Sequence, residues 1–162
     1  MRQTTLEETK RLSASGEYQR IPVYREIFSD IRTPVETLKI LKGASSHCFL
    51  LESIEDRERW GRYTFLGYDP TMELTCVDGQ MTRKEKTAPG TGYQTTTWNT
   101  KKPQEEIRKI LEENRSPKVE GLPTFTGGLV GYFSYDYLKY SEPSLKFTPK
   151  TEADFRDMDL MM

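Results

Sequence analysis

The first residues that could do chemistry are Leu50, Leu51, Glu52 and Ser53, an apolar pair followed by two polar side chains. They end a short apolar run that begins at His47 and is typical of a buried strand. A strand end presents a carboxylate, a hydroxyl and free backbone groups together. These groups suit a small zwitterion, whose ammonium needs acceptors and whose carboxylate needs donors. The competing interpretation is a strand that leaves the core with ordinary polar residues, and composition alone favours it.

A second candidate is the segment 58–67, ERWGRYTFLG, which mixes arginines with aromatic residues. Such a mixture can stack nucleic-acid bases or hold an anion. The competing interpretation is a strand with an aromatic core face and arginines toward solvent. The whole chain carries 24 Lys and Arg against 25 Asp and Glu, a net charge of -1. Because this balance gives no field that attracts nucleic acid, we expect no nucleic-acid partner.

A third candidate is the glycine-rich segment 126–132, TGGLVGY. Its glycines could let backbone amides cradle a phosphate. The segment is neither a GxGxxG motif nor a P-loop, since no Lys-Ser/Thr pair follows its last glycine. We therefore interpret it as a strand where another backbone approaches closely.

Metal and nucleophile chemistry has little support in the composition. His47 is the only histidine, and Cys48 and Cys76 lie in apolar runs without the spacing of metal ligands. We interpret both cysteines as buried free thiols of a cytoplasmic protein, and we assign no metal ligand. No run approaches the roughly 18 apolar residues that a membrane span needs, and the polar first ten residues are no secretory signal. We expect no membrane partner.

A helix is predicted to begin after Thr33, which can cap it, with Pro34 in the first turn and Glu36 completing a capping box. Apolar residues at helical spacing, Val35, Leu38 and Leu41, then line one face, and Gly43 is the predicted stop.

Strands are predicted at 47–52, 63–68 and 72–77, and Asp78-Gly79 predicts a hairpin with 80–86 as the returning strand. A further strand is predicted at 94–98. The segment 105–113 predicts an amphipathic helix whose inner stripe is Ile107, Ile110 and Leu111. Hairpins without regular βαβ units predict an α+β fold of mostly antiparallel sheet with flanking helices.

The two ends of the chain differ in character. Residues 1–20 form a polar leader with a short helix expected around Leu6 to Leu12, and residues 21–162 are the expected domain. The segment 157–162, DMDLMM, is apolar and has no polar tail. We expect a chain truncated at the start of a strand.

Four segments together resemble the N-terminal region of anthranilate synthase component I, in the chorismate-using enzyme family. They are IPVYREIFSDIRTPVETLKIL, FLLES, ERWGRYTFLGYDP and FTGGLVGYFSYD, and the resemblance runs from about Tyr18 to Met162. It implies that the complete subunit converts chorismate and ammonia to anthranilate and pyruvate with magnesium, while a glutamine amidotransferase partner supplies the ammonia. In this family the catalytic residues and magnesium-binding carboxylates lie in the C-terminal part. No motif here matches them, so we assign no catalytic residue and expect this chain alone to be inactive.

The resemblance also implies feedback inhibition by L-tryptophan. The LLES segment resembles one wall of the family's tryptophan pocket, which makes Leu51, Glu52 and Ser53 binding candidates, with Ser53 foremost. Spacing from Ser53 places Arg62 or Tyr63 on the neighbouring strand at the same pocket. The family's opposite wall lies outside this sequence, so we expect weak tryptophan binding or none by this chain alone.

Two alternatives remain open from the sequence. One is the N-terminal part of aminodeoxychorismate synthase component I, a sister enzyme that shares the GGLVGY-type segment. The complete ERWGRYTFLG segment favours anthranilate synthase over this sister enzyme. The other is a stand-alone amino-acid-binding module, against which the apolar end of the chain argues.

Overall fold

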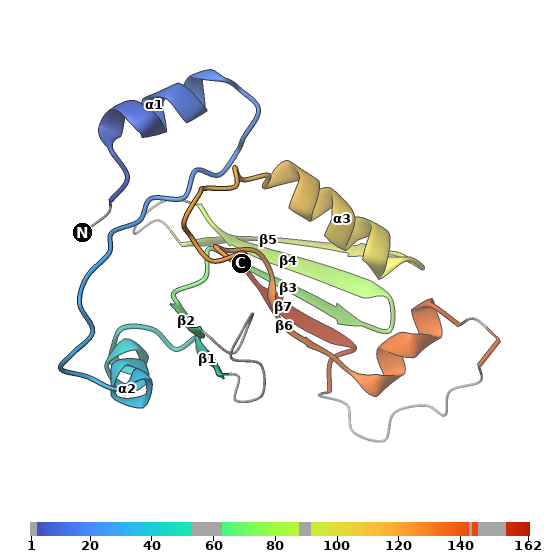
Figure 1. Cartoon of the computed structure of the whole chain (residues 1–162). Coiled ribbons are helices and arrows are strands. Elements are labelled where there is room, and N and C mark those ends of the chain that lie inside the picture. The colour runs from blue at the N-terminus through green and yellow to red at the C-terminus, as the bar shows by residue number, and fades with distance from the viewer. Residues whose placement is uncertain (1–2, 53–62, 88–91, 143, 146–154) are drawn as a thin grey trace. The chain divides into compact units, whose positions relative to one another are not determined.

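A computed structural model describes residues 3–52, 63–87, 92–142, 144–145 and 155–162. The chain forms two compact units (Figure 1). The first unit contains residues 1–70 and 114–126, and the second contains 71–113 and 127–162. The division expected from the sequence, a leader over 1–20 and a domain over 21–162, stays a prediction.

The second unit is built on a five-stranded antiparallel sheet with the strand order β5-β4-β3-β7-β6. In chain order the strands are β3 (Met72–Val77), β4 (Gln80–Lys86), β5 (Tyr93–Asn99), β6 (Val130–Phe133) and β7 (Met158–Met161). The predicted α+β fold with antiparallel sheet is therefore confirmed. The strand expected at the end of the chain is β7, which lies inside the sheet between β3 and β6.

The β3–β4 hairpin follows from its turn residues. Asp78 and Gly79 have φ angles of 48° and 81°, the left-handed conformation that a two-residue type I′ turn requires at both positions. The flanking strands pair from Val77 and Gln80 outward. Their predicted bounds, 72–77 and 80–86, are confirmed without change.

The hydrophobic core of the second unit lies between the sheet and α3 (Pro103–Glu113), which runs along one face of the sheet (Figure 1). Alternate residues of β3 enter this core, as the period of a strand requires. The predicted inner stripe of α3 is correct for Ile110, which is 3% exposed, and for Ile107, which packs against the core. It is wrong for Leu111, which is 44% exposed because it follows the stripe by one residue and turns away from the sheet. The core consists of Met72, Leu74, Cys76, Met81, Ile110, Met158 and Leu160.

The end of the glycine-rich segment, residues 130–132, lies in β6, and the predicted close backbone approach is confirmed there. A Cβ at Gly131 would collide with the backbone carbonyl of Asp159 on β7. The chain then continues into the short 3-10 helix η1 (Tyr135–Tyr140), from which Tyr137 and Tyr140 pack against the core.

The first unit contains α1 (Leu6–Ala14), α2 (Pro34–Ala44), and the antiparallel pair of β1 (Cys48–Glu52) and β2 (Thr64–Tyr68). The capping box of α2 is confirmed, because Glu36 N–H donates to Thr33 Oγ1 and Thr33 N–H donates to Glu36 Oε2. The predicted stop at Gly43 is wrong. The helix passes through Gly43 and ends at Ala44. Ser45 caps it with an extended backbone, while its N–H still donates to the Leu41 carbonyl.

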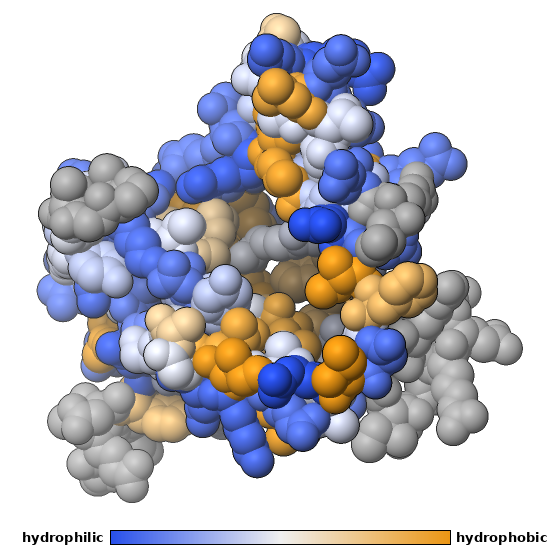
Figure 2. Space-filling model, turned by 90° about the vertical axis from the view of Figure 1, so that its left-hand side faces the viewer, coloured by the Kyte–Doolittle hydropathy of each residue, from blue (hydrophilic) through white to orange (hydrophobic). Residues whose placement is uncertain are grey.

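The first unit has no hydrophobic core of its own among its described residues, where Pro117 alone is buried. The segment between α1 and α2 instead exposes large apolar side chains. Figure 2 shows orange apolar groups standing among blue polar ones on one face of the molecule. In the segment between α1 and α2, four apolar residues are between 70% and 85% exposed: Val23, Ile27, Phe28 and Ile31.

Candidate functional site

The predicted binding segment lies at the end of β1, in the first unit. Leu51 pairs with Phe65 and Glu52 pairs with Thr64 across the two strands. Tyr63 directly precedes β2, whose pairing with β1 ends at Thr64 opposite Glu52, so its place on the neighbouring strand at the pocket stays a prediction. Ser53 and Arg62 lie outside the described residues. The role of all five residues in binding tryptophan stays a prediction.

The register divides the described candidates between two faces. Residues directly opposite each other in an antiparallel pair share a face, and successive residues of a strand alternate between faces. Leu51, which is 48% exposed, therefore shares a face with Phe65, whose ring contacts that of Tyr63. Glu52 lies on the other face, opposite Thr64. At this end of the strand pair, an apolar ligand group on the Leu51 face would meet the ring of Phe65.

An aromatic cluster on this face was missed in the sequence. The rings of Tyr63 and Phe65 have centroids 5.9 Å apart, and Phe125 and Phe65 form a T-shaped pair at 5.5 Å with an interplanar angle of 85°. Phe125 comes from residues 114–126, which return to the first unit after α3. Its position at the start of the glycine-rich segment was visible in the sequence, but nothing there indicated which strand it would contact.

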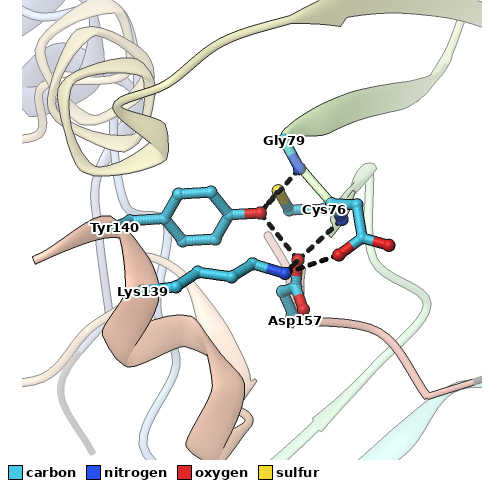
Figure 3. A network of polar contacts seen from close by, with 6 residues as sticks. Cys76, Gly79, Lys139, Tyr140 and Asp157 are labelled. Atoms are coloured by element: carbon cyan, nitrogen blue, oxygen red, sulfur yellow. Dashed lines mark hydrogen bonds and ion pairs between the residues drawn. The ribbon is translucent and has the colours of Figure 1, made fainter. Parts of the chain in front are cut away.

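A second constellation, in the second unit, was also missed. The Asp157 carboxylate is fully buried, and its Oδ2 accepts hydrogen bonds from the Asp78 N–H and the Tyr140 hydroxyl, both at 2.7 Å. Lys139 Nζ lies 2.9 Å from the same oxygen and 2.6 Å from Asp78 Oδ1. The Tyr140 hydroxyl in turn accepts the Gly79 N–H at 2.6 Å. Figure 3 shows these groups converging from the β3–β4 turn, η1 and the start of β7.

The electrostatics of this network favour a structural role. Burial, reinforced by the hydrogen bond to Asp157, raises the pKa of Tyr140 far above its ordinary value and keeps the phenol neutral. Partial burial disfavours the Lys139 ammonium, but its hydrogen bonds to Asp78 and Asp157 outweigh this effect and raise its pKa. Burial also raises the pKa of the Cys76 thiol, against the opposing hydrogen bond with Tyr140. A neutral, buried thiol is a poor nucleophile, so the network holds elements together and offers no reacting group.

Neither a metal site nor a membrane-spanning helix is found in the described part of the chain. Its histidines, cysteines and carboxylates form no group of three or more that could hold a metal ion. None of the helices among the described residues is long and apolar enough to cross a membrane.

Comparison with known proteins supports one relationship along nearly the whole chain. Anthranilate synthase component 1 of Acinetobacter calcoaceticus is 38% identical over 154 residues, which are 93% of this chain. The proteins of the same name from Pseudomonas aeruginosa and Acetivibrio thermocellus are 35% and 34% identical over 90% and 85% of the chain. The chain is similar to anthranilate synthase component 1. The resemblance expected from the sequence is therefore confirmed.

The extent of the similarity limits what passes from these relatives to this chain. The chain spans 29% of the length of the Acinetobacter anthranilate synthase component 1, and 28% and 26% of the other two. A scan against protein-family models finds no match. The activity, substrates and partners of the complete anthranilate synthase component 1 are accordingly proposals for this chain.

Proposed function

We propose that this chain is the N-terminal, tryptophan-regulated portion of an anthranilate synthase component 1. The observation that carries the proposal is 38% identity over 93% of the chain to a relative of that name. The complete subunit would convert chorismate and ammonia to anthranilate and pyruvate in the cytoplasm. The rest of that subunit would hold the catalytic residues and magnesium, and a glutamine amidotransferase would supply the ammonia.

The regulatory site of the proposal is the end of the β1–β2 pair. Leu51 and Tyr63 offer apolar and aromatic surface for an indole ring, and the half-exposed Leu51 side chain leaves that surface accessible. Ser53, Glu52 and Arg62 supply the hydroxyl, carboxylate and guanidinium that would bind the ammonium and carboxylate of tryptophan. Inhibition then follows if tryptophan binds one arrangement of the subunit better than another.

The test is the substitution Ser53→Phe in the full-length subunit, with anthranilate formation measured at increasing tryptophan concentration. We expect normal turnover without tryptophan and loss of inhibition, because the new ring fills the site but touches no catalytic group. Ser116→Phe, a change of the same size at an exposed serine of the first unit, is the control and should keep inhibition. Unchanged inhibition in Ser53→Phe would refute the site.

The product and the isolated chain test the rest of the proposal. Formation of aminodeoxychorismate instead of anthranilate would assign the parent to the sister enzyme. Calorimetry with tryptophan should show weak binding or none by the 162-residue chain and clear binding by the full-length subunit. Equal affinity of the two would instead indicate a self-sufficient amino-acid-binding module.

A further inference from the structure

We propose that Phe125 is a positioning residue that couples the candidate site on β1 and β2 to the glycine pair Gly127–Gly128. This inference rests on the proposed function, since it concerns how tryptophan binding at that site changes the rest of the subunit. Phe125 itself need not touch tryptophan.

The first observation is the chain of ring contacts in the first unit. Leu51 and Tyr63, the two described candidates with apolar surface, both adjoin Phe65, one across the strands and one two residues before it. The rings of Phe125 and Phe65 are nearly perpendicular, with their centroids 5.5 Å apart. A ligand that displaces or fixes the Phe65 ring therefore acts directly on Phe125, because packed rings resist compression.

The second observation is the backbone that follows Phe125. The chain leaves the first unit after Thr126, and the second unit resumes with Gly127 and Gly128. Their φ angles are 154° and 133°, values that residues with a side chain rarely adopt. A Cβ built on Gly127 would meet nothing within 4 Å, so its conformation is not imposed by close packing.

The third observation is that the other side of the glycine pair is fixed. Gly131 in β6 lies so close to the Asp159 backbone that it has no room for a methyl group. The pair thus lies between two held points, the Phe125 ring on Phe65 and the β6 backbone on β7. Two glycines between anchored segments are where a backbone rearrangement costs least, as in hinges generally. Ligand-dependent movement of Phe65 would then be converted into a change of torsion at Gly127–Gly128.

The test separates binding from its effect, in the full-length subunit. One measurement is the Kd of tryptophan by calorimetry, and the other is the fold reduction of kcat/KM for chorismate at saturating tryptophan. Phe125→Leu keeps most of the apolar volume but removes the aromatic ring. We expect a Kd within about threefold of wild type, and a fold reduction smaller than wild type by between about two- and thirtyfold. Gly127→Ala, which strains the torsion without a steric clash, should also alter the fold reduction while the Kd stays near wild type.

Phe155→Leu is the matched control. It removes a ring contact with Tyr132 at 5.7 Å, and both of these residues follow the glycine pair in the chain and belong to the second unit. It should retain wild-type inhibition, and equal loss in this variant would overturn the inference. So would an unchanged fold reduction in both Phe125→Leu and Gly127→Ala. A weaker Kd in Phe125→Leu with the full reduction at saturation would make Phe125 part of the binding site and likewise overturn its coupling role.

If Phe125→Leu does not fold, Gly127→Ala decides alone. A wild-type subunit that tryptophan does not inhibit would refute the proposed function itself, and this inference with it.

Discussion

The fully buried Asp157 carboxylate accepts a 2.7 Å hydrogen bond from the Tyr140 hydroxyl, which joins the residue before β7 to the last residue of η1. The same hydroxyl accepts the N–H of Gly79 from the β3–β4 turn. The phenol of Tyr140 therefore connects three elements. It lies 61 residues after Gly79 and 17 residues before Asp157 in the chain. Because β7 is paired on both sides, this connection helps to fix where an internal strand of the sheet begins.

Replacing Tyr140 by Phe should lower the free energy of unfolding by about 1–3 kcal/mol, since it leaves the Gly79 N–H and one side of Asp157 without their partner. Urea unfolding followed by circular dichroism measures the change. Tyr135→Phe is the control, because Tyr135 is 83% exposed, and it should change stability by less than about 0.5 kcal/mol. Equal effects of the two substitutions would show that the network contributes nothing.

The same network predicts a loss of stability in alkali. Cys76, Tyr140 and Lys139 all have a raised pKa in the folded protein, against ordinary values of 9.0, 10.0 and 10.5. The folded state therefore holds these protons more tightly than the unfolded state. The resulting stabilisation is complete below about pH 9 and is lost as the pH rises through the folded pKa values.

Urea midpoints measured at intervals between about pH 8 and 11 test this expectation. The midpoint should fall across the range, and Tyr140→Phe should fall less steeply above pH 10, because it lacks the phenol whose proton the fold retains. A midpoint that is flat or rises with pH would contradict the assigned directions.

Two glycines should respond oppositely to alanine. Gly131→Ala places a methyl group against the Asp159 backbone, which cannot move without disturbing β7, and should destabilise the chain by about 1–3 kcal/mol. Gly43→Ala, inside α2 with nothing within 4 Å, should stabilise the helix by about 0.5–1 kcal/mol. Unfolding of both variants by urea gives the comparison, and a loss of stability in Gly43→Ala would contradict it.

Local sequence signals predicted the elements that local chemistry determines. The Asp78-Gly79 turn and the alternation around it gave β3 and β4 their bounds, and the Thr33–Glu36 box located the start of α2. The errors at Gly43 and Leu111 are of the same local kind. A glycine is tolerated inside a helix at modest cost, and a stripe one residue too wide includes a side chain that the neighbouring sheet cannot reach.

Relationships over long distances in the chain could not be predicted in this way. Nothing in the sequence around Asp157 indicates Tyr140 or Asp78 as its partners, since the sheet pairing brings them together. The contact of Phe125 with Phe65 is of the same kind, between residues whose intervening chain includes all of α3. The candidate site was predicted because the LLES segment resembles one wall of the family's tryptophan pocket. Its aromatic cluster became visible only with the register of β1 and β2.

The two units should differ in hydrogen exchange. The amides of β3, β4 and β7 are paired in a five-stranded sheet over the core, so they should exchange only with global unfolding of the second unit. The β1–β2 pair is a two-stranded sheet, a form that is marginally stable by itself, in a unit whose described residues include Pro117 as the single buried one. Mass spectrometry of the 162-residue chain should find faster exchange in β1 and β2, and equal protection of both sheets would contradict this expectation.

The same measurement on the full-length subunit connects stability with function. If tryptophan binds at the end of β1 and β2, it stabilises the ordered pair by mass action, and exchange there should slow as its concentration rises. Protection should increase across 48–52 and 64–68, while β3 and β4, already protected by the core, should change little. Phenylalanine, which lacks the indole N–H, is the matched ligand control at equal concentration. Slower exchange in β3 and β4 without any in β1 and β2 would place the tryptophan site elsewhere.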